Sequence, residues 1–271
     1  MRKALTAKAL SAKSLLAATA VFASLVACED PKAKSTPPAA TTPAKVEVAP
    51  SAAPVAPVAS TAAPVMKKPV ECKMDPEVTF HMPGLEAEVR KKLVKETGPI
   101  KKEELAKIRS LNLTSVSIDD LDPCVFPYFT GVKDIFLGPG TLKDLKPLTK
   151  LPQLVSLRAS INGVSDLKPL EHMVHLDRLD LGRTAVVDIS PLANLVELTE
   201  LQLDQTQVTD LAPLAKCTKL QKLSIQNTPV KDLSPLVSLK QLKMLHIAGT
   251  PIDNTSMLAP LVSRGLKIIS K

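Results

Sequence analysis

Four consecutive stretches of 22 residues, covering residues 151–238, share one pattern of apolar, acidic and proline positions. They read, in chain order, LPQLVSLRASINGVSDLKPLEH, MVHLDRLDLGRTAVVDISPLAN, LVELTELQLDQTQVTDLAPLAK and CTKLQKLSIQNTPVKDLSPLVS. An aspartate and a proline recur at this spacing through five units: Asp144, Asp166, Asp188, Asp210 and Asp232, and Pro147, Pro169, Pro191, Pro213 and Pro235. A fixed period of this kind is typical of an array of structural repeats.

Within one unit, the apolar positions predict a coil that closes on its own core. The alternation in Leu179–Leu181 is that of a strand with one buried face. The next apolar positions point inward from the opposite side: Val186 or Val187, then Ile189 and Leu192. Because each coil buries its leucines only against its neighbours, we expect the array to fold as one unit.

Two polar columns accompany the apolar ones. The repeated aspartate can accept backbone N–H groups of a short helical turn, and the proline fits the first turn, where no donor is needed. A second column can satisfy backbone groups where the chain leaves the strand, and it consists of Asn162, Thr184, Thr206, Thr228 and Thr250. One carboxylate per coil beside a leucine is a poor calcium site, so we expect caps and no metal.

The consensus L-x-x-L-x-L-x-x-T-x-V-x-D-L-x-P-L-x-x-L resembles a leucine-rich repeat, in particular the 22-residue internalin type. The preceding stretch, residues 77–108, is similar to the helical cap of internalins, including the phrase GPIKKEELAKIRSL at 98–111. The resemblance covers about residues 77–271. It implies an α/β solenoid: a right-handed coil with a concave parallel β-sheet, short 3₁₀ or helical turns on the convex side, and a helical N-terminal cap.

The two ends of the array depart from the consensus. An irregular first repeat starts at Leu111–Leu113, 24 residues before Ile135–Leu137. The final unit, 242–271, loses the Asp–Pro signature, and we expect Leu258, Leu261 and the strand-like residues 266–269 to close that edge. We therefore assign residues 71–108 to the cap and residues 109–271 to about six to seven repeats, including the irregular terminal ones.

Residues 1–27 are typical of a secretory signal peptide, with an apolar run at 14–27, no acidic residue, and four basic ones: Arg2, Lys3, Lys8 and Lys13. The run ends in LVAC at 25–28, which resembles the lipobox of bacterial lipoproteins. That resemblance implies a diacylglycerol on Cys28, cleavage before it, and an N-acyl lipid on the new amine, hence stable membrane attachment. The alternatives are a plain signal peptide with a chance cysteine and an uncut membrane anchor.

Residues 28–70 contain the cysteine expected to carry lipid and a Pro/Ala-rich segment. Among the 42 residues from 29 to 70, 9 are Pro, 11 are Ala and none is Gly. This composition has no helical or strand period and cannot bury enough surface to fold. We predict a disordered tether that holds the following domain away from a membrane. The alternative is a proline-rich ligand for a recognition module.

The charge balance argues against a nucleic-acid partner. The chain has 35 Lys and Arg against 27 Asp and Glu, and removal of the signal peptide takes away four positive charges, which leaves 31 − 27 = +4. Aromatic residues make up only 2% of the chain, and no basic cluster is interleaved with aromatic side chains on which bases could stack.

The remaining cysteines fit an exported domain. Cys217 occupies a leucine column and is expected to be a buried thiol. Cys72 and Cys124 both lie near the N-terminal edge of the array, and in an oxidising compartment we expect them to form a disulfide. Two free thiols are the alternative.

The few aromatic residues are concentrated near the start of the repeats, at Phe126, Tyr128, Phe129 and Phe136. They are expected to fill the space between the cap and the first regular repeat. The alternative is an exposed aromatic contact patch beside the binding face.

The outward residues of the strands form the candidate protein-binding surface. They are mixed in charge, mostly small and polar, and include two arginines, a residue type common in binding hot spots. The candidates are Phe136, Arg158, Arg178, Asp180, Glu200, Gln202, Asp204, Lys222, Gln226 and His246. A solvated face without a ligand is the alternative.

Catalytic chemistry has no recognisable signature. The histidines are scattered, and no nucleophile elbow or phosphate-binding loop is present. A leucine-rich array is also expected to lack a pocket. We therefore predict a non-enzymatic lipoprotein of the bacterial cell envelope, without a cofactor or small-molecule substrate, that binds a protein partner. It would be exported and lipid-anchored, on a periplasmic face or at the cell surface. The alternative is a structural spacer.

Overall fold

The structure is a computed structural model that describes Cys72 and residues 75–271. The predicted signal peptide, Cys28 and the predicted tether lie outside the described residues.

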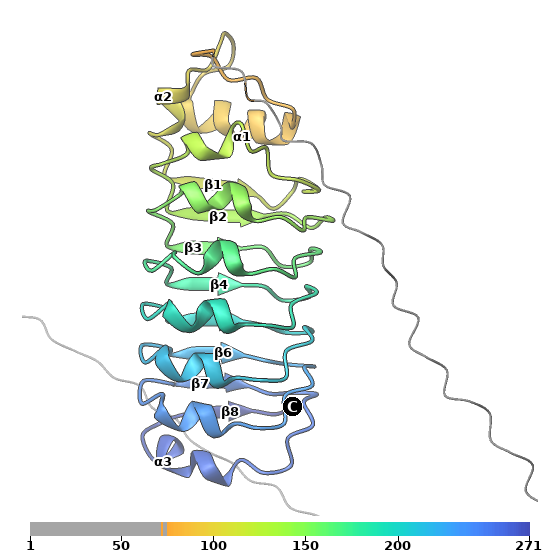
Figure 1. Cartoon of the computed structure of the whole chain (residues 1–271), viewed down its shortest axis with the longest axis vertical. Coiled ribbons are helices and arrows are strands. Elements are labelled where there is room, and N and C mark those ends of the chain that lie inside the picture. Colours follow the sequence, from red (N-terminus) through yellow and green to blue (C-terminus); the bar gives the residue numbers. More distant parts are fainter. Residues whose placement is uncertain (1–71, 73–74) are drawn as a thin grey trace, which may run out of the picture. The chain divides into compact units, whose positions relative to one another are not determined.

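Eight short strands form one parallel sheet in which every strand pairs with the next in chain order (Figure 1). The 22-residue period sets the register, so that Leu157 lies beside Leu179, and Leu179 beside Leu201. The strands are β1 (Ser110–Leu113), β2 (Asp134–Leu137), β3 (Ser156–Arg158), β4 (Arg178–Asp180), β5 (Glu200–Gln202), β6 (Lys222–Ser224), β7 (Met244–His246) and β8 (Lys267–Ile269).

Short 3₁₀ helices return the chain from each strand to the next. Each of the five aspartates of the repeat column accepts the backbone N–H of the residue two positions later, at 2.8 or 2.9 Å. The capping role predicted for this column is confirmed. The helices are η1 (Phe126–Tyr128), η2 (Lys146–Lys150), η3 (Lys168–Leu170), η4 (Ser190–Asn194), η5 (Ala212–Lys216), η6 (Ser234–Ser238) and η7 (Ser256–Leu258).

The core is a continuous ladder of leucines and other aliphatic residues between the sheet and the 3₁₀ helices. Val186 is fully buried, whereas Val187 is 58% exposed, so Val186 is the residue that points into the core. Where the chain leaves the strand, Thr184, Thr206 and Thr228 each donate a hydroxyl hydrogen bond to the carbonyl three residues before, at 2.6 or 2.7 Å. The predicted α/β solenoid is confirmed.

The N-terminal edge of the sheet is covered by helix α1 (Pro83–Leu93), which is followed by the short helix α2 (Lys102–Leu105). From α1, Leu85 and Val89 are buried in the core, and the Glu88 carboxylate accepts the backbone N–H of Asn112 in β1 at 3.2 Å. The helix thereby protects an otherwise open strand edge.

A disulfide joins Cys72 to Cys124, with a Cα–Cα distance of 5.2 Å. Just beyond Cys124, Phe126 and Phe129 are fully buried and meet edge to face, with ring centroids 5.7 Å apart. These two rings fill the space between the cap and the first regular repeat, as expected, whereas Phe136 is half-buried on the outer face of β2. Tyr128 is half-buried, and the Lys102 amine lies 4.8 Å from its ring centroid.

The C-terminal edge is closed by helix α3 (Ala259–Val262) and β8. Leu258, Leu261 and Leu266 are buried there, in agreement with the prediction for the last unit. Asn254, which replaces the aspartate of the earlier repeats, accepts the Ser256 N–H at 2.7 Å and so preserves the cap without a charge.

Candidate functional site

The strand register assembles the candidate residues on the outer face of the sheet, which we call the concave face. One row, in register from β2 to β7, contains Phe136, Arg158, Asp180, Gln202, Ser224 and His246. A parallel row contains Asp134, Ser156, Arg178, Glu200, Lys222 and Met244. Asp204 and Gln226 each lie two residues after the end of their strand. All ten candidates therefore belong to one surface.

Several charges on this face are paired between neighbouring coils. Arg158 Nε lies 3.2 Å from Asp180 Oδ2, and Lys222 Nζ lies 2.6 Å from Glu200 Oε1. The arginine and lysine side chains are half exposed, so each pair contributes little to stability, about 0–1 kcal/mol.

Two of the candidate carboxylates also hold the local backbone. Asp180 Oδ1 accepts the Gly182 N–H at 3.0 Å. Asp204 Oδ1 accepts the Gln226 N–H at 2.8 Å and the Ser224 hydroxyl at 2.5 Å. Asp180 therefore stabilises the turn that follows its own strand, whereas Asp204 holds the end of β6 and the residues after it in the next coil.

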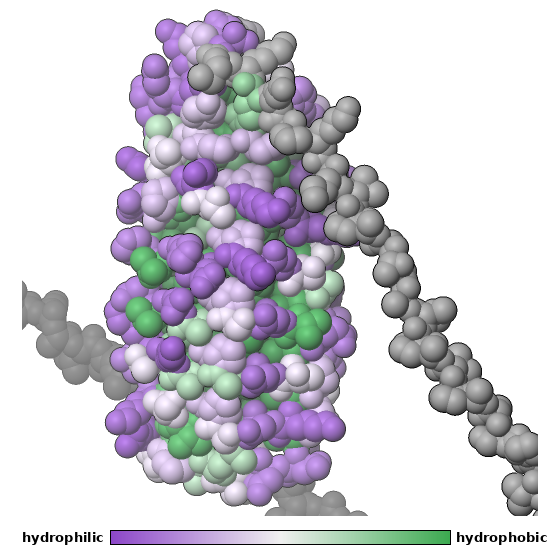
Figure 2. Space-filling view, viewed as in Figure 1, coloured by the Kyte–Doolittle hydropathy of each residue, from purple (hydrophilic) through white to green (hydrophobic). Residues whose placement is uncertain are grey.

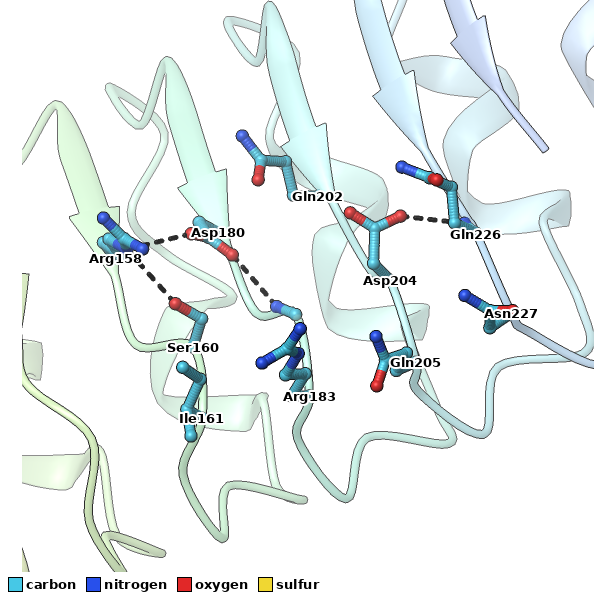
Figure 3. A pocket seen from close by; sticks show the side chains of 11 residues that line it. Arg158, Ser160, Ile161, Asp180, Arg183, Gln202, Asp204, Gln205, Gln226 and Asn227 are labelled. Atoms are coloured by element: carbon cyan, nitrogen blue, oxygen red, sulfur yellow. Dashed lines mark hydrogen bonds and ion pairs between the residues drawn. The ribbon is translucent and has the colours of Figure 1, made fainter. Parts of the chain in front are cut away.

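An open hollow lies at the carboxyl ends of β3 to β6, which corrects the expectation that the array has no pocket (Figure 3). Its volume is about 420 Å³. We call it the concave-edge hollow, and it is lined by Arg158, Ser160, Ile161, Asp180, Gly182, Arg183, Gln202, Asp204, Gln205, Gln226 and Asn227. Successive coils of the solenoid supply equivalent positions, so the hollow is a direct product of the repeat.

A third column in this hollow was missed by the sequence reasoning. It consists of residues with left-handed backbone, φ between 53° and 58°: Ile161, Arg183, Gln205 and Asn227. Each backbone N–H in the column donates to a carbonyl of the following coil, for example Arg183 N to Asp204 O at 2.7 Å. The signal that could have found the column is its place immediately before the Asn162 and threonine column.

Two comparisons identify the type of domain. The family described as Leucine Rich repeats (2 copies) matches residues 218–260. Internalin C2 of Listeria monocytogenes is 25% identical, aligns over 74% of this chain and 100% of its own, and gives a TM-score of 0.62. The described region is an internalin-type leucine-rich repeat domain. No curated protein matches the sequence.

A second Listeria monocytogenes internalin, inlF, shares the fold of the internalin-type domain. It is 23% identical, aligns over 70% of this chain and 63% of its own, and gives a TM-score of 0.59. At this level of identity the likeness concerns the fold alone.

The surface of the internalin-type domain is mostly polar. Figure 2 shows small apolar areas separated by polar ones on the face turned to the viewer. Among the described residues, the exposed large apolar side chains are Val94, Ile161, Val174, Val187, Val196, Val237, Met257 and Val262. Most are single valines, which need no functional explanation.

Cys217 is fully buried in the leucine column, and burial raises the pKa of its thiol to about 11. In Cys72 and residues 75–271, no group of three or more His, Cys, Asp or Glu side chains is placed to hold a metal ion. None of the helices in the same part of the chain has the length and apolar character that crossing a membrane requires.

Proposed function

We propose that the protein is a membrane-anchored, non-enzymatic lipoprotein of the bacterial cell envelope that recognises a protein partner through the concave face. The observation that carries this proposal is the pair of in-register rows of polar and charged side chains on one eight-stranded sheet, where Arg158, Arg178 and Gln202 are exposed and Asp180 and Glu200 are half-buried. A row held on strands binds with little loss of conformational freedom, which favours affinity.

The anchor is inferred from the sequence. The LVAC motif at 25–28 supports lipid on Cys28, and the Pro/Ala-rich residues 29–70 support a spacer between the lipid and the domain. The proposed order is lipid, tether and binding domain.

The alternative function is a structural or spacer lipoprotein without a specific concave-face ligand. The pairing of Arg158 with Asp180 and of Lys222 with Glu200 favours this alternative, because paired charges are partly satisfied without a partner. The two functions differ in whether changes to the concave face alter protein contacts in the cell.

A charge-reversal experiment separates them. Arg178 and Lys222 are 54% and 56% exposed at their side chains, so the double variant Arg178→Glu and Lys222→Glu should fold normally. The matched control is Lys216→Glu with Lys240→Glu, which reverses two exposed charges away from the concave face.

In-cell crosslinking followed by mass spectrometry provides the measurement. Protein partners recovered with the wild type and the control should be lost, or reduced about tenfold, in the concave-face variant. Equal recovery with all three proteins would favour the spacer function.

A further inference from the structure

The concave-edge hollow contains two kinds of polar group. The first kind is satisfied inside the protein: Arg158 contacts Asp180 and Ser160, and Asp204 accepts from Gln226 and Ser224. Figure 3 shows the contacts of Arg158 with Asp180 and Ser160, and that of Asp204 with Gln226.

The second kind is available to a ligand. Among the described residues, four side chains lining the hollow make no hydrogen bond or ion pair with the rest of the protein: Arg183, Gln202, Gln205 and Asn227. Three of them are amides, which both donate and accept, and the fourth is a guanidinium, which only donates. Figure 3 shows these groups on neighbouring coils along the hollow.

Ile161 begins the left-handed column and is unusual in two ways. Its φ is 58°, a conformation that a β-branched residue adopts at a cost of about 1–2 kcal/mol. Its side chain is nevertheless 44% exposed, beside the coil that carries Arg183. Because the repeat imposes this conformation on each coil, the feature that distinguishes Ile161 is its exposed apolar side chain, which presents an apolar contact at one end of a polar hollow.

We propose that the concave-edge hollow binds an extended peptide segment that carries an acidic side chain next to an apolar one. The acidic group pairs with Arg183, the apolar side chain covers Ile161, and the amides of Gln202, Gln205 and Asn227 hydrogen-bond the peptide backbone. This inference rests on the proposed protein-binding function and names the chemistry that the site selects.

The side chains favour a peptide over other ligands. Each peptide unit offers one N–H and one C=O, which match the donor and acceptor of an amide side chain. No aromatic ring lines the hollow, so it provides no surface on which sugar rings or bases could stack. Guanidinium and carboxylate form a strong charge-assisted pair, which selects an acidic residue.

The dimensions of the column set the length of the segment. Ile161 and Asn227 are three coils apart, and neighbouring strands lie about 4.8 Å apart, so the column spans about 14 Å. An extended chain covers that distance with about four residues. Because Asp204 repels a second acid, the acidic residue belongs at the end near Ile161 and Arg183.

A peptide selection tests the proposal. The full chain, solubilised in detergent and immobilised, is incubated with phage displaying a randomised four-residue segment between Gly-Ser flanks, and the retained sequences are counted. The variants are Arg183→Glu and Ile161→Asn, and the matched control is Arg264→Glu, an exposed arginine in the last unit.

We expect the wild type and Arg264→Glu to enrich Asp or Glu about tenfold over Lys or Arg at one position, with an apolar residue beside it. Arg183→Glu should invert the charge preference, and Ile161→Asn should remove only the apolar one. Absence of acidic enrichment, or the same preference in Arg183→Glu, would overturn the proposal. The proposal would also be overturned if the immobilised wild type selected no peptide but retained soluble cell-wall glycans, and if Gln205→Ala did not retain them.

The in-cell crosslinking described above distinguishes this failure from failure of the proposed function. If partners are lost with the Arg178 and Lys222 reversals but fully retained with Arg183→Glu, protein binding stands and the peptide site is wrong. If Arg183→Glu also loses the partners, the protein-binding function and the peptide site are both supported.

Discussion

At the scale of single residues, the left-handed column requires the same backbone conformation, with a positive φ, of residues whose side chains differ chemically. Asn227 and Gly249 are residue types that adopt this conformation readily, with φ of 53° and 71°. Ile161 occupies the equivalent position with φ of 58° and a branched side chain. The backbone of the solenoid therefore imposes a conformation that Ile161 disfavours.

Exchanging these residues should change stability in opposite directions. We expect Ile161→Asn to raise the free energy of unfolding by about 1 kcal/mol, because asparagine tolerates the left-handed region. The reciprocal Asn227→Ile should lower it by about 1–2 kcal/mol. Urea unfolding monitored by circular dichroism measures the free energy of unfolding of both variants. A loss of stability in Ile161→Asn would contradict the inference that the backbone of Ile161 is strained.

The capping aspartates predict a dependence of stability on pH. Hydrogen bonds from the Ser190 backbone N–H and hydroxyl lower the pKa of Asp188, and those from the Ser234 hydroxyl and N–H lower the pKa of Asp232. A carboxyl with a lowered folded-state pKa stabilises the fold above its unfolded pKa, about 3.9, and that contribution is lost as pH falls through the folded value.

The double variant Ser190→Ala and Ser234→Ala should raise both pKa values towards the ordinary range, as measured by carboxylate NMR titration. Its stability should then fall less steeply than that of the wild type between about pH 5 and pH 2. Ser256→Ala is the control, because the residue that caps Ser256, Asn254, is uncharged and accepts the Ser256 N–H. Identical slopes in the double variant and the wild type would refute the prediction.

At the scale of elements, the sequence predicted those structural features that each depend on a single column of the repeat. The inward leucines, the caps at Asp144 through Asp232 and the threonine bonds follow from local spacing, and each is present. The left-handed column was not predicted. Its positive φ is set by the connection between strand and turn, and no single residue type marks this position in the sequence.

The geometry of the concave face was predicted only in part. The rows follow from the period, so the placement of Arg158, Asp180 and Gln202 was foreseeable. The concave-edge hollow was not foreseeable, because its shape depends on which side chains of neighbouring coils turn towards each other. Asp204 turns towards Ser224, whereas Arg183 finds no ionic partner in the described residues.

The cap is the element whose attachment depends most on a covalent bond. The disulfide between Cys72 and Cys124 closes a loop with a sequence separation of 52. We expect Cys124→Ser to lower the free energy of unfolding by about 2–4 kcal/mol. Urea unfolding with and without dithiothreitol tests this, since reductant should destabilise the wild type and leave the variant unchanged. A wild type that is indifferent to reductant would contradict the prediction.

At the scale of the whole molecule, the proposed anchor can be tested independently of the fold. Cys28→Ala removes the thiol that would carry diacylglycerol, so the protein should move from the membrane to the soluble fraction on cell fractionation. Cys124→Ser is the matched control, because it removes a cysteine and should leave the protein at the membrane. Membrane attachment of Cys28→Ala would mean that a different feature anchors the chain.

The disulfide also determines how the domain carries mechanical load. Tension applied to the chain before Cys72 passes through the sulfur–sulfur bond to Cys124, so the residues between them, including α1, α2 and β1, are not stretched. A pull between a membrane and a bound partner would therefore reach the array at the entrance to η1. The cap that protects the sheet edge is shielded from the force that an anchored protein transmits.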